Sequence, residues 1–210
     1  MSEESHYQNH FKGTTTVGIV FDKGVIVAAD KRATMGSFIA SKDVEKVLAV
    51  SDSIVVTTAG GVGDAQSLVR LMRAELELYK HSRGRDMTVK GAATLLANVL
   101  QGNKYYPYLV QIIVAGFDDS PHLYDVDLMG GLLEEKYTST GSGSVVAYGI
   151  LDAGFKPNLK EDEAVALAVK AVRSAIKRDS ATGEGVDVII VSKDKMKRLK
   201  ESDVAGPNAA

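Results

Sequence analysis

The sequence of 210 residues contains no cysteine, which rules out disulfide bonds and thiolate chemistry and fits an intracellular protein. There is no excess of basic residues either. Lys and Arg number 25, Asp and Glu number 27, and the net charge of -2 gives no overall basic field for nucleic acid. No apolar run approaches the roughly 20 residues that span a membrane. With 45% hydrophobic residues, the chain is expected to bury the core of one domain.

Histidine is also scarce, and the four histidines are scattered. His6 and His10 lie in a polar stretch, His81 lies among charges at the end of a predicted helix, and His122 follows a Ser-Pro turn. Solvated surface histidines are the favoured interpretation. Without a histidine at a strand end facing a glycine-rich loop, Ser-His-Asp and Cys-His catalysis are disfavoured. A zinc site is disfavoured for the same reason and for the lack of cysteine.

Alternating and helically spaced apolar residues predict the elements. Expected strands cover 17–21, 24–30, 38–40, 47–50, 54–61, 108–118, 123–128, 135–140 and 186–192. Expected helices cover 65–79 with a stop at Gly84, 89–100 between Thr88 and Gly102, and 165–176 after a capping box of Asn158 and Glu161. From Lys195 the chain turns charged, and we expect a frayed end. This order predicts one domain of two antiparallel sheets packed face to face, with helix layers outside.

Two glycine-rich segments have two open interpretations each. AGGVGD (59–64) precedes a helix, whose free N–H groups could hold an anion, and TGSGS (140–144) could do the same. Neither matches a nucleotide-binding motif, and each segment, taken alone, is more often a tight turn than a binding site.

The first dozen residues, MSEESHYQNHFK, are polar and lack the apolar segment of a secretory signal, so we expect a solvated tail or a processed pro-segment. Gly13 and Thr14 follow directly. One catalytic arrangement needs no histidine: an N-terminal threonine, whose α-amine has a reference pKa of about 7.7–8.0 and accepts the proton of its own hydroxyl. An amide nitrogen has no such basicity. This chemistry therefore needs a cleavable Gly-Thr junction after a dispensable tail.

The segment GTTTVGIVFDKGVIVAADKRATMGSFIASKDVEKV resembles proteasome β subunits, most closely the archaeal type. Further matching blocks are TTAGGVGDAQ, YLVQIIVAG, STGSGS followed by YG, KRDSATG and VDVIIV, in the expected order from about Gly13 to Val191. The resemblance implies an α+β fold of the N-terminal nucleophile hydrolases, a four-layer αββα sandwich. It also implies a propeptide over 1–13, removed by autocleavage, and a hydrolase domain over 14–210.

The resemblance further implies the site residues. Thr14 matches the nucleophile, Asp30 and Lys46 the ion pair beside it, and Gly60 the backbone oxyanion donor. Ser142, Asp179 and Thr182 match the polar group around the amine, with Thr182 standing where the family commonly has serine. Thr15 and Thr16 are then expected to be strand residues. Positions that match substrate-binding residues are Ala33, Thr34, Val44, Leu48, Thr58, Gly60 and Val62.

From this resemblance we expect a cytoplasmic threonine endopeptidase that needs no metal or other cofactor. The positions that match the first specificity pocket carry small or apolar side chains, which predicts cleavage after hydrophobic residues. These positions are Ala33, Val44, Leu48, Thr58 and Val62. The implied partners are other β subunits in a seven-membered ring, rings of α subunits, a regulatory ATPase ring and unfolded polypeptide, with no nucleic acid or membrane. Two alternatives remain open: a catalytically silent ring member, and an anion- or nucleotide-binding module built on the two glycine-rich segments.

Overall fold

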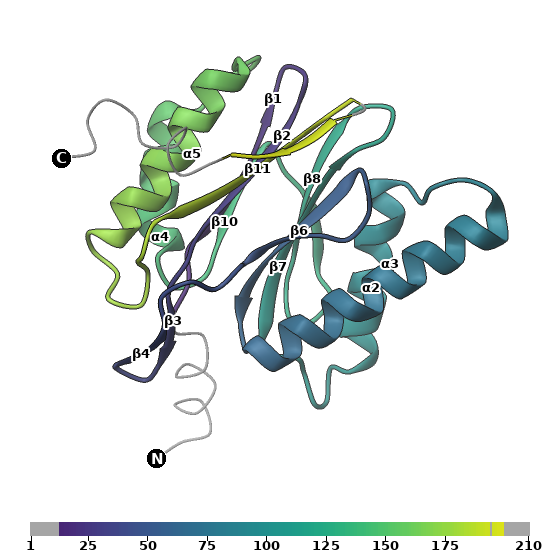
Figure 1. The fold of residues 1–210 in the computed structure, drawn as a ribbon, viewed down its shortest axis with the longest axis horizontal. Coiled ribbons are helices and arrows are strands. Elements are labelled where there is room, and N and C mark those ends of the chain that lie inside the picture. Colours follow the sequence, from purple (N-terminus) through teal and green to yellow (C-terminus); the bar gives the residue numbers. More distant parts are fainter. Residues whose placement is uncertain (1–12, 194, 200–210) are drawn as a thin grey trace.

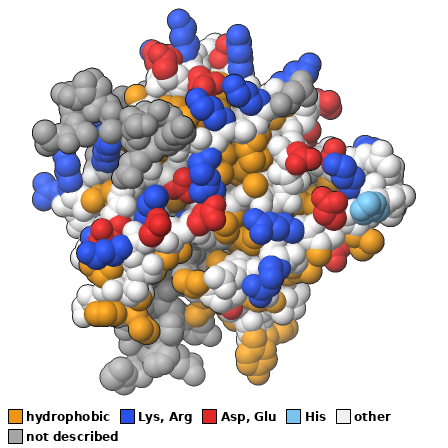
Figure 2. Space-filling model, viewed as in Figure 1, with side chains coloured by type: hydrophobic (Ala, Val, Ile, Leu, Met, Phe, Trp, Pro, Cys, Tyr) orange, Lys and Arg blue, Asp and Glu red, His pale blue; other side chains and the backbone are white. Residues whose placement is uncertain are grey.

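The computed structural model describes residues 13–193 and 195–199, which form two stacked β-sheets between two layers of helices (Figure 1). The predictions for the polar stretch with His6 and His10, and for the frayed end beyond residue 199, lie outside the described residues. No described helix is both long and apolar enough to cross a membrane. On the face drawn in Figure 2, acidic and basic side chains are interspersed, in keeping with the nearly balanced charge.

The first sheet has the strand order β10-β1-β2-β11-β12, and all its neighbouring strands are antiparallel. Its strands, in chain order, are β1 (Thr16–Phe21), β2 (Gly24–Asp30), β10 (Tyr137–Thr140), β11 (Val186–Ser192) and β12 (Lys195–Arg198). The two predicted strands form a hairpin, in which β1 and β2 pair from Thr16 opposite Ala29 to Phe21 opposite Gly24. The start of β1 therefore lies beside the end of β2.

The second sheet has the order β5-β6-β7-β8-β9 and is also antiparallel. Its strands are β5 (Val47–Ala49), β6 (Ile54–Gly60), β7 (Val110–Phe117), β8 (Pro121–Val126) and β9 (Leu132–Glu134). A separate hairpin of β3 (Ala33–Met35) and β4 (Phe38–Ser41) connects the two sheets along the chain. Val47 pairs with Thr57 in the middle of β6, so the residues that precede β5 lie beside the last residues of β6.

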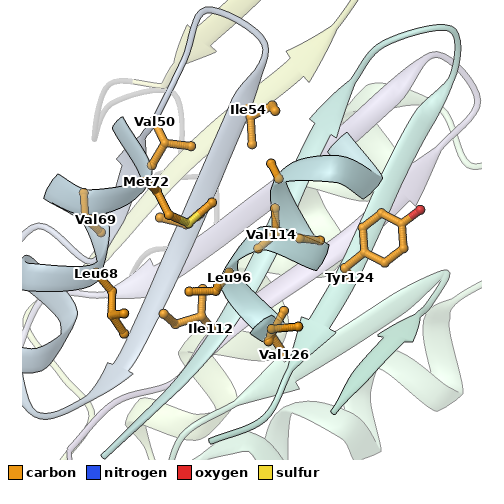
Figure 3. Close-up of a cluster of buried hydrophobic side chains, with 14 of the residues drawn as sticks. Val50, Ile54, Leu68, Val69, Met72, Leu96, Ile112, Val114, Tyr124 and Val126 are labelled. Atoms are coloured by element: carbon orange, nitrogen blue, oxygen red, sulfur yellow. The ribbon is translucent and has the colours of Figure 1, made fainter. Parts of the chain in front are cut away.

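Helices α2 (Val62–Arg83) and α3 (Val89–Gly102) cover the outer face of the second sheet (Figure 1). As predicted, Gly84 ends α2 in the left-handed conformation with φ 66°, and the Thr88 side chain caps α3 by accepting from Gly91 N. Figure 3 shows the side chains that join these layers, with Leu68 and Met72 of α2 facing the strands beside Leu96 of α3. Burial of such side chains stabilises the layer by about 1.5–3 kcal/mol each.

Helices α4 (Ser144–Gly154) and α5 (Glu161–Ile176) cover the outer face of the first sheet. The predicted capping box at Asn158 and Glu161 is wrong. The residue before α5 is Lys160, whose backbone N–H donates to Glu163 Oε2 at 3.0 Å. Asn158 instead adopts a left-handed φ of 60° in the preceding turn, a conformation that asparagine tolerates.

A third cluster of apolar side chains fills the space between the sheets. Alternate residues of β2 serve two cores: Val25 and Val27 point toward the second sheet, and Ile26 and Ala28 point toward α4 and α5. A strand buried on both faces reads as a continuous apolar run, which explains GVIVAAD. The predicted class, two antiparallel sheets flanked by helices, is confirmed.

Four elements were not predicted: β3, α4, β9 and β12. Helix α4 begins at Ser144, after the N-cap residue Gly143, without a side-chain cap or an acidic first turn, and it exposes Val145, so the usual starting signals are missing. Strand β12 reads KMKR, whose charges suggested a solvated end.

Candidate active site

The ends of four strands bring the predicted residues to one edge of the two sheets. Asp30 is the last residue of β2, and Thr14 lies two residues before β1. Lys46 immediately precedes β5, and Gly60 is the last residue of β6. Two backbone hydrogen bonds hold these segments together in pairs. Asp30 N donates to Thr15 O at 3.2 Å, and Thr58 N donates to Lys46 O at 3.0 Å.

Asp30 and Lys46 form a buried ion pair, as predicted. Lys46 Nζ lies 2.8 Å from Asp30 Oδ1, and the two side chains are 5% and 0% exposed. Burial lowers the pKa of Lys46, and the neighbouring Asp30 carboxylate opposes that effect. Asp30 also accepts from three backbone N–H groups, those of Thr15 (2.9 Å), Arg32 (3.1 Å) and Gly183 (2.9 Å). Four donors thus surround one carboxylate.

The bond between Gly13 and Thr14 lies inside this arrangement. Thr14 is 5% exposed, and its hydroxyl donates to Gly13 O. Lys46 Nζ donates to the same carbonyl oxygen at 3.1 Å. In the uncut chain, the buried ammonium therefore contacts the carbonyl next to the predicted nucleophile.

A second polar group contacts Thr14 and Thr15. Asp179 Oδ2 accepts from both Ser142 Oγ and Thr182 Oγ1, each at 2.5 Å. Thr182 Oγ1 also lies 2.8 Å from Thr15 Oγ1, and Ser142 Oγ lies 3.5 Å from Thr14 O. The structure therefore brings Ser142, Asp179 and Thr182 together, and the Thr182 hydroxyl donates to Asp179. Thr15 was predicted to be a strand residue, but it precedes β1 and belongs to this hydrogen-bond network.

Two glycines in the site hold conformations that a side chain would disturb. Gly60 has φ 126°, and a Cβ there would lie 2.1 Å from Leu109 O. Gly141 has φ 91°, and a Cβ there would lie 2.2 Å from Thr14 O. Gly141 N donates to the side chain of Gln111 at 3.1 Å, which ties the second sheet to the loop that carries Ser142. Sequence reasoning missed Gln111, because one amide side chain on an apolar strand gives no local signal.

The predicted substrate-binding residues fall around these strand ends. Ala33 and Thr34 are partly buried on β3, as are Val44 before β5 and Leu48 within it. Thr58 on β6 is 8% exposed, whereas Val62 at the start of α2 is 51% exposed. Leu48 also packs against the cluster under α2 and α3. Among the described residues, Thr34 Oγ1 is a buried hydroxyl without a hydrogen-bond partner.

The two glycine-rich segments do open helices, but both are already engaged by acidic groups. Asp64 in the first turn of α2 accepts from Leu109 N at 2.9 Å, and its carboxylate disfavours an anion there. In the segment before α4, Ser142 is bonded to Asp179. These contacts favour the turn interpretation of both segments.

The two described histidines, His81 and His122, do not belong to the group of residues around Thr14. His81 is 83% exposed, as expected. The solvated interpretation is wrong for His122, whose side chain is 26% exposed and whose Nδ1 lies 2.7 Å from Glu134 Oε1. In the parts of the chain that the structure describes, no group of three or more His, Cys, Asp and Glu side chains is placed to hold a metal ion.

Comparison with known proteins agrees with this geometry. Residues 10–191 match the family model described as "Proteasome subunit". Proteins named proteasome subunit beta are similar over nearly the whole chain. The one from Methanocorpusculum labreanum is 53% identical and covers 98% of this chain and 97% of its own. The one from Methanoregula boonei is 52% identical over 94% of both chains, and the one from Methanosarcina barkeri is 46% identical over 96% of both. The chain therefore belongs to the proteasome subunit family, as one of its β subunits.

Proposed function

We propose that this chain is a threonine endopeptidase, with Thr14 as the nucleophile after the Gly13–Thr14 bond is cut. As a proteasome β subunit, the chain is a protease subunit of the 20S core. The threonine assignment is supported chiefly by one observation: the buried Lys46–Asp30 pair contacts the carbonyl of Gly13, and the Ser142–Asp179–Thr182 group contacts the carbonyl of Thr14.

In the proposed reaction, the freed α-amine of Thr14 takes the hydroxyl proton through a bridging water. Thr14 Oγ1 attacks the substrate carbonyl, and the Gly60 N–H stabilises the oxyanion that forms. Collapse of this intermediate breaks the peptide bond. The leaving amine takes the proton, and an ester to Thr14 remains. Water, deprotonated by the α-amine of Thr14, then hydrolyses the ester and regenerates the hydroxyl of Thr14.

The other side chains maintain the charges that this reaction needs. The Lys46 cation, paired with Asp30, favours negative charge developing on the threonine oxygen. Asp179 would hold the α-amine by a charge-assisted hydrogen bond once that amine exists. No step requires a metal or an organic cofactor.

We propose that the same hydroxyl removes residues 1–13. Thr14 Oγ1 attacks the Gly13 carbonyl carbon, and the peptide C–N bond breaks as the hydroxyl proton passes through water to the leaving nitrogen of Thr14. A second water hydrolyses the resulting ester, which releases the carboxyl group of Gly13 and regenerates the hydroxyl. Water serves as the base, because no free amine exists at that stage. The 3.1 Å contact from Lys46 Nζ to Gly13 O supports the proposal, since it places a cation where negative charge develops.

Substrate is proposed to bind as an extended strand between Thr34 and the Gly60 segment, with its side chain near Ala33, Val44, Leu48, Thr58 and Val62. This lining carries no charge, so the chain is expected to cleave after hydrophobic residues. Fluorogenic peptides ending in Leu, Arg or Glu would test the preference. Faster cleavage after Arg or Glu would contradict it.

The proposal includes assembly in the cytoplasm with other subunits into the proteasome core. By family resemblance, seven β subunits form a ring, two such rings stack between rings of α subunits, and an ATPase ring supplies unfolded polypeptide. Confinement in such a chamber would restrict a nucleophile of low specificity to chains that have been unfolded.

The experiment compares Thr14→Ala, Thr14→Ser and Thr15→Ser in assembled particles, using peptide hydrolysis and the mass of the chain. Thr14→Ala should remove hydrolysis and leave the chain uncut, and Thr14→Ser should keep part of both activities. Thr15→Ser preserves a hydroxyl beside Thr182 and serves as the control. Full peptidase activity in Thr14→Ala would favour the silent ring member. Nucleotide binding without any peptidase activity would favour the binding module.

A further inference from the structure

The last described strand, β12, carries a charged sequence but is not a solvated end. It pairs antiparallel with β11, with Arg198 opposite Ile189, and Leu199 N donates to Val188 O at 3.0 Å. This pairing brings Arg198 from near the end of the chain to the segment that carries Lys46. We propose that Arg198 is a positioning residue for Lys46, an inference that rests on the proposed threonine peptidase function.

The guanidinium of Arg198 bonds to the residues on both sides of Lys46. Its Nη2 donates to Val47 O at 2.8 Å and also contacts Glu45 Oε1. Lys46 O itself accepts from Thr58 N on β6 at 3.0 Å. Three consecutive residues are thus anchored, the middle one to β6 and its two neighbours to one guanidinium.

A third contact fixes the guanidinium itself. Arg198 Nη1 donates to Asp187 Oδ2 on β11 at 2.7 Å, and the Asp187 side chain is only 8% exposed. Burial raises the pKa of Asp187, and Arg198 opposes that effect by stabilising the carboxylate. Glu45 is 53% exposed, so its ion pair contributes little compared with the bonds to Asp187 and Val47.

The three contacts suit arginine in particular. A guanidinium is a planar fork whose two terminal nitrogens point to separate acceptors, here Asp187 on β11 and the carbonyl of Val47 at the start of β5. A lysine ammonium is a single point and cannot reproduce that geometry, although it keeps the charge. Arg198 therefore connects β11, next to the Asp30 strand, with the segment that holds Lys46.

The consequence concerns the position of the Lys46 ammonium. Lys46 Nζ lies 2.8 Å from Asp30 Oδ1 and 3.1 Å from Gly13 O. Without Arg198, the segment would keep its hydrogen bond to β6 and the packing of Val47 against β11, but lose the polar link to Asp187. A misplacement of about 1 Å in such a group lowers turnover by up to roughly 100-fold. Arg198 contacts no proposed reacting atom, so its effect passes through Lys46.

The test compares Arg198→Met and Arg198→Lys with Arg73→Lys in assembled particles. Arg73 is a matched control, because it donates from α2 to Ala49 O on the same strand β5, through Nε at 2.9 Å and Nη2 at 2.7 Å. Arg198→Met should lower kcat for peptide hydrolysis by about 10- to 100-fold with KM changed by less than about twofold. Cleavage of the Gly13–Thr14 bond should slow in parallel. Arg198→Lys should fall between, and Arg73→Lys should match the parent.

A general loss of stability would not produce this split, because it lowers the amount of active particle and not the turnover of each site. Active sites are therefore counted by mass spectrometry as chains beginning at Thr14. If Arg198→Met does not assemble, Arg198→Lys decides alone. Turnover equal to the parent in either assembled Arg198 variant, or a rise in KM at unchanged kcat, overturns the inference. Activity in Thr14→Ala would instead overturn the proposed function, so the two failures are distinguishable.

Discussion

Replacing Asp30 with Asn tests whether the buried ion pair organises the site. The change preserves the size of the side chain and removes its charge. Asp30 Oδ1 accepts from Lys46 and Thr15 N, and Oδ2 accepts from Arg32 N and Gly183 N. An amide has one oxygen and one NH2 group, so two of these four donors would face another donor.

The expected magnitude follows from these contacts. Each buried donor left without an acceptor costs about 1–3 kcal/mol, so two cost about 2–6 kcal/mol. This range brackets the cost of about 3–5 kcal/mol for breaking a buried ion pair by removing one partner. For a chain of this size, that loss lowers the unfolding midpoint by about 6–20 °C. Because the Asp30 carboxylate also supports the charge of Lys46, peptidase activity should fall with it.

The assay is urea and thermal unfolding of the purified subunit carrying Thr14→Ala, so that no chain is cut during the measurement. Asp43→Asn is the control. Asp43 also pairs with a lysine, Lys31, at 3.2 Å, but its side chain is 86% exposed. Such a pair contributes about 0–1 kcal/mol. If Asp30→Asn and Asp43→Asn differ by less than about 1 kcal/mol, the buried carboxylate does not hold the site together.

Two further substitutions test other parts of the structure. Gly60→Ala should lower peptidase activity by at least about 100-fold, because its Cβ would displace the backbone that supplies the oxyanion donor; near-parental kcat would contradict this role. Asp125→Asn should make unfolding less dependent on pH. Burial raises the pKa of Asp125, so the folded state loses stability as pH rises through the range in which this carboxyl ionises. The variant should therefore be at least as stable as the parent at pH 7. If Asp125→Asn lost more stability relative to the parent at pH 7 than at pH 4, the raised pKa of Asp125 would be refuted.

The strands and the long helices could be predicted because their signals are local. Strands β1 and β2 show apolar residues around a turn, and α2 and α3 show helical spacing with a glycine stop and a threonine cap. Helix α4 and strands β3, β9 and β12 lack such signals. Their stability comes from packing and pairing with other segments of the chain, as in the pairing of Arg198 with Ile189. A local sequence pattern does not reveal tertiary contacts of this kind.

The same distinction applies to the site. The positions of Thr14, Asp30 and Lys46 were predicted through the family resemblance, and the antiparallel strand pairing explains why they meet. Gln111 and Arg198 were missed, because each acts through one hydrogen-bonding side chain supplied by a strand distant in sequence. A single amide on an apolar strand and one arginine in a charged run do not stand out.

Identifying the N-terminal residue of the chain in active particles tests whether cleavage before Thr14 creates the nucleophile. Intact-mass measurement of assembled particles, paired with their peptidase activity, reads it without any substitution. The proposed mechanism predicts that active particles contain a chain beginning at Thr14, and that peptidase activity rises with the fraction of chains cut between Gly13 and Thr14. Full activity in particles whose chains still begin at Met1 or Ser2 would contradict it.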